Sequence, residues 1–162
     1  MDIHTHSLPM ERLSELLVMQ MHNGGRARLT VTGYSMMPML RNRRDTVELV
    51  AAQGQQRKGD IILYRRENGQ FVLHRIIARE STGYLCCGDN QAVREPVAPE
   101  QVIAVVDAFY RNGKKYTMDN AGYRLYTAIW VGGFPLRPYY IALRRRLGRL
   151  RRRKKQGGNT YV

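Results

Sequence analysis

The sequence DIILYRRENGQFVLHRIIARESTGYLCCG, residues 60–88, contains three short apolar runs separated by turn-forming residues. Each run is rich in Ile, Leu, Val or Tyr and is too short for an ordinary helix, which indicates β-strands. The Glu-Asn-Gly at residues 67–69 is typical of a tight turn. Because no helical pattern separates the runs, the sequence predicts consecutive antiparallel strands rather than a parallel α/β sheet.

The same pattern extends in both directions along the chain. Further strands are predicted at residues 27–33, 46–52, 101–111 and 114–119. We therefore expect a mainly β fold, a coiled antiparallel sheet or partial β-barrel. The periodicity also predicts an N-terminal helix within residues 1–25, a β domain over 26–119 and a basic, aromatic helical tail over 120–162.

The composition narrows the class of protein. The chain has 162 residues, of which 43% are hydrophobic, which suits one domain with its own core. Cys86 and Cys87 are adjacent and are its two cysteines, which excludes a disulfide scaffold and a four-ligand zinc site. His4 and His6 lie in the N-terminal segment and are a weak metal signal, so we assign no metal and no cofactor.

Ser35 stands in the segment Val31–Leu40, after Gly33 and before Pro38. Gly33 permits an unusual backbone angle and Pro38 stiffens the chain, so the segment is either a structural turn or the position of a nucleophile. His74 is a candidate general base, because a neutral imidazole accepts a proton near neutral pH. On a strand it shares a face with Val72 and Ile76, where a histidine is also common as a core or surface residue.

A carboxylate near His74 would orient the imidazole ring and stabilise its charged form. Asp89, within Gly88-Asp-Asn-Gln, and Glu95 are the two candidates, and the residues do not separate them. Alone, the Gly-Asp-Asn sequence is simply a favourable turn.

Taken together, four segments resemble the S24/S26 serine peptidases, which include the signal peptidases and the LexA-type self-cleaving repressors. The resemblance extends from Thr30 to Val106, about half of the chain. Residues 33–40, GYSMMPML, are similar to the nucleophile motif of the family, and residues 58–64, KGDIILY, to its following strand. Residues 73–77, LHRII, are similar to its base motif and residues 88–91, GDNQ, to its closing motif.

The resemblance implies a serine endopeptidase with the LexA/signal peptidase type of fold. Ser35 would be the nucleophile and His74 the base, and the pair His74-Arg75 is similar to the endoplasmic-reticulum and archaeal subtype rather than to the lysine subtype. The substrate would be a leader or signal-like peptide. The residues implied in substrate binding are Gly33, Met36, Pro38 and Arg75, with Asp89 or Glu95 assisting the base. The alternatives are an inactive peptide- or membrane-binding adaptor and a LexA-like DNA-binding regulator.

The charge is concentrated near the C-terminus. The chain carries 27 Lys and Arg against 13 Asp and Glu, a formal net charge of +14, and residues 137–162 hold ten Lys or Arg and no acid. Such a tail predicts an anionic partner, for which we favour a membrane surface over nucleic acid. The aromatic residues of the tail either pack on the body as core residues or enter the interface: Trp130, Phe134, Tyr139 and Tyr140. With no signal-peptide pattern, we expect a cytoplasmic, peripheral membrane protein; nothing in the sequence indicates its oligomeric state.

Overall fold

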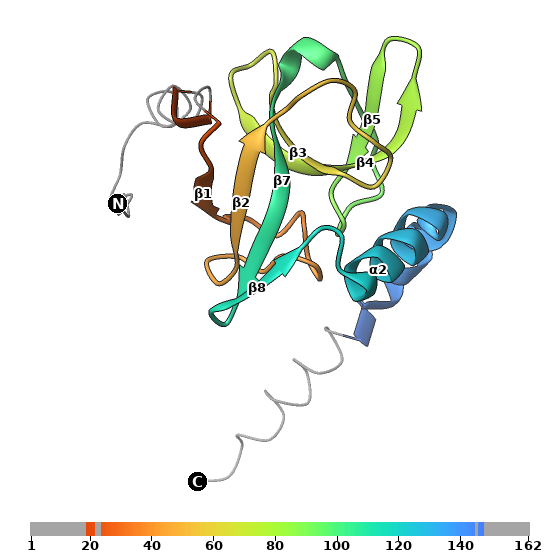
Figure 1. Ribbon diagram of the computed structural model, residues 1–162. Coiled ribbons are helices and arrows are strands. Elements are labelled where there is room, and N and C mark those ends of the chain that lie inside the picture. Colours follow the sequence, from red (N-terminus) through yellow and green to blue (C-terminus); the bar gives the residue numbers. More distant parts are fainter. Residues whose placement is uncertain (1–18, 22–23, 145, 148–162) are drawn as a thin grey trace, which may run out of the picture.

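The computed structural model describes residues 19–21, 24–144 and 146–147, and it is mainly β (Figure 1). Most of the predicted N-terminal helix lies outside the described residues. The part that is described, residues 19–21, is helical. The last part of the predicted basic tail, residues 148–162, also lies outside the described residues.

The sheet has eight antiparallel strands and is not closed, in the order β1-β2-β7-β3-β4-β5-β6 with β8 on β7. The strands are β1 (Ala27–Thr30), β2 (Thr46–Ala51), β3 (Ile61–Arg65), β4 (Phe71–Glu80), β5 (Gly83–Cys87), β6 (Glu95–Val97), β7 (Val102–Arg111) and β8 (Lys114–Thr117). The prediction of a mainly β, antiparallel fold is confirmed. Strand β6 was not predicted, because its three residues include a proline and carry no alternating pattern.

Strand β7 lies in the interior of the sheet, and strand β4 carries His74. β7 pairs with β2 along one edge, and with β3 and then β8 along the other. The β3–β4 hairpin is closed by a hydrogen bond from Arg66 N–H to the Gln70 carbonyl (2.9 Å), with Gly69 at φ +83°. This turn sets the register in which Leu63 faces Leu73 and Ile62 faces His74.

Alternation along β4 distributes its side chains between two hydrophobic clusters. Val72 and Ile76 belong to one cluster with Tyr64 and Cys86, whereas Leu73 packs against the larger one. The larger cluster also contains residues from outside the sheet: Met36, Met39 and Leu40 from the β1–β2 connection and Tyr123 from the C-terminal helix. Both the segment that carries Ser35 and the C-terminal helix are therefore built into the core.

Helix α2 (Ala121–Gly132) begins at Asn120, whose side chain accepts hydrogen bonds from the Gly122 and Tyr123 amides. A short 3₁₀ helix, η2 (Phe134–Leu136), follows, and residues 137–144 form a further helical segment. Figure 1 shows this helical pair beside the lower end of β4 and β5. Within the described residues, no helix is both long and apolar enough to cross a membrane.

A fully buried ion pair joins α2 to the sheet. Arg75 on β4 and Asp89 after β5 are both 0% exposed and form two hydrogen bonds, Nε–Oδ1 (2.9 Å) and Nη2–Oδ2 (2.8 Å). Arg75 Nη1 also donates to the Tyr123 hydroxyl (2.9 Å), and the Trp130 indole N–H donates to the Asp89 carbonyl (3.2 Å). Both Arg75 and Asp89 are therefore hydrogen-bonded to residues of α2.

We predict that Arg75→Leu lowers the free energy of unfolding by about 3–5 kcal/mol, because it leaves the Asp89 carboxylate buried without its partner. Arg79→Leu, at an exposed position of the same strand, should change it by less than about 0.5 kcal/mol. The double variant Arg75→Leu/Asp89→Leu should be more stable than Arg75→Leu alone. Urea denaturation measures all three, and equal, small losses for Arg75→Leu and Arg79→Leu would contradict the role of the pair.

Candidate active site

Ser35 lies in a compact connection between β1 and β2, and the backbone of this connection is closed at its base. Val31 N–H donates to the Asp45 carbonyl (2.9 Å) and Arg43 N–H to the Val31 carbonyl (2.7 Å). Gly33 has φ +90°, a conformation that favours glycine, and its N–H is accepted by the Asn42 side chain (3.0 Å). With Met36 buried in the core, Ser35 is held half-buried at a fixed position.

The connection after β5, residues 88–91, holds Ser35 from the other side. Asn90 N–H donates to the Ser35 carbonyl (2.6 Å), and the Asn90 side-chain amide donates to the Tyr34 carbonyl (3.2 Å). A Cβ atom at Gly88 would lie 2.7 Å from the Ser35 carbonyl oxygen and 3.0 Å from the Ser35 Cβ. Glycine is therefore needed at position 88 because Ser35 packs directly against it.

Arg137 anchors this second connection to the helical segment. Its side chain is 3% exposed, and its Nη1 donates to the Gly88 carbonyl (3.1 Å) while its Nη2 donates to the Trp130 carbonyl (3.0 Å). The guanidinium also lies 4.6 Å from the centre of the Phe134 ring. Arg137 thus has a structural role. The charge pattern of the sequence had counted it with the basic tail, but it is buried and does not contribute to the exposed charge.

His74 is 3% exposed and belongs to a chain of polar side chains. Its Nδ1 is 3.2 Å from the Tyr64 hydroxyl, which in turn donates to Glu95 Oε2 (2.8 Å). Glu95 on β6 is held by both Nε and Nη2 of Arg66, at 2.5 and 2.6 Å. The direct separation between His74 Nδ1 and Glu95 Oε2 is 3.9 Å, so the carboxylate reaches the ring through the tyrosine.

These hydrogen bonds determine which imidazole nitrogen of His74 is protonated. Tyr64 has one hydroxyl proton and donates it to Glu95, so its oxygen accepts from His74 Nδ1–H. The neutral ring then carries its lone pair on Nε2, the form required of a base that takes a proton from a serine hydroxyl.

The same environment keeps His74 neutral. Burial lowers the pKa of His74 to about 4, although the neighbouring Glu95 carboxylate favours the charged form. The hydrogen bonds from Arg66 and Tyr64 lower the pKa of Glu95, which is therefore ionised near neutral pH. A neutral imidazole beside an ionised acid is the resting arrangement of a general base.

Ser35 and His74 line one pocket of about 610 Å³. Its other lining residues include Gly33, Met36, Arg66 and Gln91. In the described residues no hydrogen bond joins the two side chains, and such bonds often tighten only when substrate binds. The structure thus brings the predicted nucleophile and base to the same cavity.

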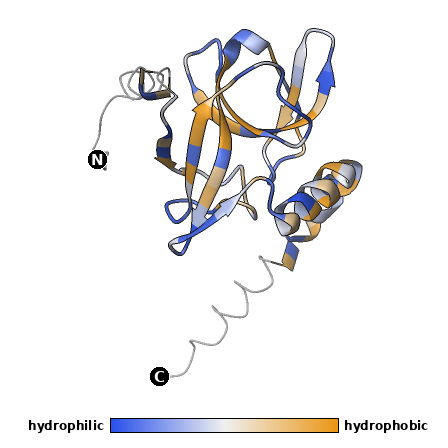
Figure 2. Ribbon diagram, in the orientation of Figure 1, coloured by the Kyte–Doolittle hydropathy of each residue, from blue (hydrophilic) through white to orange (hydrophobic). Residues whose placement is uncertain are grey.

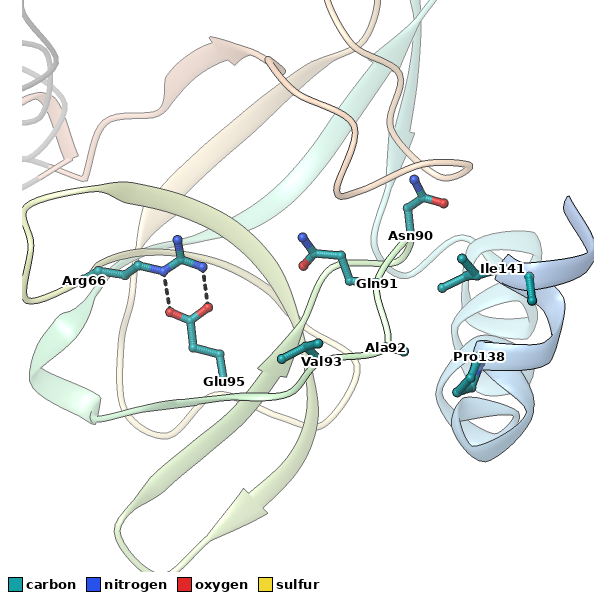
Figure 3. Close-up of a pocket in the computed structure, with 9 residues that line it drawn as sticks. Arg66, Asn90, Gln91, Ala92, Val93, Glu95, Pro138 and Ile141 are labelled. Carbon is teal, nitrogen blue, oxygen red and sulfur yellow. Dashed lines mark hydrogen bonds and ion pairs between the residues drawn. The ribbon is translucent and has the colours of Figure 1, made fainter. Parts of the chain in front are cut away.

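A second pocket, of about 420 Å³, adjoins the first and shares Arg66 and Gln91 with it. Figure 3 shows the Arg66–Glu95 pair on one side of this pocket and Pro138 and Ile141 of the C-terminal helical segment on the other. The two cavities together extend from Ser35 to the helical segment.

The remaining predicted site residues divide into those in the pocket and those elsewhere. Gly33 and Met36 line it, whereas Pro38, which follows a cis peptide bond, is not among its lining residues. Asp89 is engaged by Arg75 rather than by His74, and Arg75 is completely buried in that pair. Of the two acids that the sequence left equal, Glu95 is therefore the one that faces His74 through Tyr64.

Tyr64 and Arg66 were not identified from the sequence as site residues. Tyr64 could have been identified from the Glu-Asn-Gly turn. This turn fixes the β3–β4 register, which makes Tyr64 a diagonal neighbour of His74 on the same face of the sheet. Arg66 follows in the turn itself, and its partner Glu95 lies on the strand that the sequence did not predict. No short-range sequence signal links Arg66 to Glu95.

The cysteines do not offer a competing nucleophile. Cys86 and Cys87 are free and 0% exposed, and burial raises the pKa of Cys86 to about 12. Among the residues that the structure describes, no group of three His, Cys, Asp or Glu side chains is arranged to hold a metal ion.

Comparisons of this chain with protein-family models, curated proteins and solved structures found no match.

Gly88→Ala should destabilise the protein by about 1–3 kcal/mol, because the added methyl overlaps the Ser35 backbone and forces the two connections apart. Gly132→Ala is the matched control, since a Cβ there meets no atom within 4 Å and alanine favours the helix. Thermal denaturation compares the two variants. If Gly88→Ala melts at or above the temperature of Gly132→Ala, the close packing of Gly88 on Ser35 does not constrain the site.

Proposed function

We propose that the protein is a serine endopeptidase of the S24/S26 type that cleaves leader or signal-like peptides. The observation that carries the proposal is the convergence of Ser35 and His74 on one pocket, with His74 backed by Tyr64 and Glu95. A buried turn or a structural histidine would not require this combination. The proposal includes a fold of the LexA/signal peptidase type, which the unclosed antiparallel sheet supports at the level of its class.

In the proposed mechanism, Ser35 Oγ attacks the carbonyl carbon of the scissile peptide while His74 Nε2 takes the hydroxyl proton. The imidazolium that forms is stabilised by the Glu95 carboxylate through Tyr64. His74 then returns the proton to the leaving amine as the C–N bond breaks. A water molecule, deprotonated by His74, releases the acyl group from Ser35. The Ser35 backbone N–H is our candidate donor to the oxyanion.

The proposed substrate is an extended peptide. Residues 71–74 of β4 pair with β3 on one side, whereas β5 pairs with β4 only from Arg75 onward. Residues 71–74 also line the pocket with Ser35. An extended segment lying along this part of β4 would bring one of its carbonyl groups toward Ser35.

We further propose a cytoplasmic location at the surface of a membrane. The support for it is the charge: +14 overall, with six Lys or Arg and no acid in residues 148–162.

The first test concerns the nucleophile. A fluorophosphonate probe should label the wild-type protein at Ser35 and fail to label Ser35→Ala, which should melt at the wild-type temperature because a small residue replaces another. Ser81→Ala, at an exposed position, should label normally. Labelling that survives in Ser35→Ala, or is absent from the wild type, would favour the inactive adaptor.

The second test concerns the base and its pH dependence. Because burial holds the pKa of His74 near 4, the labelling rate should stay high down to well below pH 6 and decline toward pH 4. By linkage, burial of neutral His74 destabilises the fold as pH falls from about 6.5 to about 4, where only the unfolded chain gains the proton. A decline in rate centred near pH 6.5 would mean that His74 is not shielded as described.

Tyr64→Phe and Glu95→Gln should each reduce the labelling rate, by about a hundredfold for Glu95→Gln, because the imidazolium loses its stabilising acid. Removing Glu95 also removes a charge that raises the pKa of His74, so the acid limb should move to lower pH. Glu100→Gln, at an exposed position, is the matched control and should have no effect. Two rates equal to that control would leave a Ser–His pair without a third member.

A further inference from the structure

The helical hairpin, defined as residues 121–147 apart from residue 145, has an apolar outer side. Seven of the ten large hydrophobic side chains exposed in the described residues belong to it, among them Leu125, Ile129, Leu136, Tyr139 and Leu143. These five are between 57% and 76% exposed. Scattered exposed hydrophobic residues are normal, but their concentration on one element marks an interaction surface.

The exposed residues are spaced as one side of each helix. Leu125 and Ile129 are four residues apart on α2, as are Tyr139 and Leu143 on the following segment. Trp130 and Tyr140 pack edge to face at 5.4 Å and join the two helices. Figure 2 shows hydrophobic stretches along both of them.

The inner side of the hairpin is occupied by the body of the protein. Tyr123 packs in the main core, and Phe134 is 8% exposed beneath Arg137. Trp130 donates to the Asp89 carbonyl. The sequence left Trp130 and Phe134 open between the core and the lipid interface; in the structure Trp130 binds the Asp89 carbonyl and Phe134 packs with Ile77 and Cys87.

The charge of the hairpin indicates the partner of its outer side. Residues 121–162 contain no Asp or Glu, Arg124 and Arg146 are exposed on the hairpin, and six further Lys or Arg follow in residues 148–162. Apolar side chains bordered by cations match the boundary between acyl chains and anionic headgroups. Nucleic acid would use the cations and stack on aromatic faces, but it would gain little from exposed Leu and Ile side chains.

We propose that the outer side of the helical hairpin docks on an anionic lipid bilayer, with Leu125, Ile129, Leu136 and Leu143 entering the acyl-chain boundary. This inference rests on the membrane location proposed above and assigns it a surface. Pro138 and Ala142 of the same hairpin line the second pocket. Docking would therefore place the two adjoining pockets beside the bilayer, where a membrane-associated leader peptide could enter them.

The experiment is flotation of the full-length protein with vesicles of phosphatidylcholine alone or with phosphatidylglycerol. The test variant combines Leu125→Ser, Ile129→Ser, Leu136→Ser and Leu143→Ser, which leaves every charge in place. We expect its partition onto anionic vesicles to fall by at least about tenfold, because apolar burial is lost. Met19→Ser, at a 69% exposed position outside the hairpin, should bind as the wild type does. Thermal denaturation checks that each variant is folded.

The outcomes separate this inference from the proposed peptidase. Ser35→Ala should float like the wild type, so loss of catalysis and loss of docking are observed independently. If the fourfold variant floats as well as the wild type, charge alone binds the membrane and the hairpin surface is not involved. The proposal is also overturned if the wild type prefers duplex DNA over anionic vesicles at matched charge. Sedimentation as a dimer that the fourfold variant abolishes, with no vesicle binding, would assign the surface to a second copy of the chain.

Discussion

The buried pair between Arg75 and Asp89 determines how the parts of the site are placed. Arg75 follows His74 on β4, and Asp89 precedes Asn90, which holds the Ser35 carbonyl. One ion pair thus fixes the strand that carries His74 relative to the connection that holds Ser35. Its desolvation would be costly without compensation, and the Tyr123 hydroxyl, the Tyr126 hydroxyl and the Gly59 carbonyl satisfy its remaining polar groups. Two of these partners, Tyr123 and Tyr126, come from α2, so the helix is part of the framework of the candidate site.

Burial has a second consequence at His74. A histidine removed from water favours its neutral form, and an imidazole lodged against an acid would ordinarily lose much of that preference. Here Tyr64 separates the ring from Glu95, and Arg66 neutralises the carboxylate from behind. The ring therefore remains neutral at rest, while the acid stays close enough to stabilise the charge that develops when a proton arrives. The tyrosine also defines the tautomer, which a direct 3.9 Å separation would not.

Most of the strands were predictable from the sequence, because they rest on local patterns, whereas the nucleophile and base roles of Ser35 and His74 stay predictions. The alternation in residues 71–80 and the turn at 67–69 determine which face His74 occupies, and Gly33 marks the connection of Ser35. The choice between Asp89 and Glu95 was not predictable, since it depends on Arg75 and Arg66, whose partners are distant in sequence. Strand β6 was missed for a related reason: its three residues acquire their conformation from pairing with β5. The family resemblance remains a resemblance, carried by motifs that match in order.

The two sides of the helical hairpin have different surroundings: one side packs on the body of the protein and the other is exposed. Its composition, apolar residues and arginines without a single acid, suits neither a core helix nor an ordinary surface helix. The structure divides this composition by side: Arg137 turns inward to bind the carbonyl groups of Gly88 and Trp130, where backbone oxygens replace water, and the Leu and Ile side chains turn outward. The two Nη atoms of Arg137 thus bind carbonyl oxygens without a carboxylate partner, while Arg124 and Arg146 remain exposed on the hairpin. The helices that hold residues 88–91 in place thus also present an apolar surface, and any partner of that surface would lie next to the second pocket.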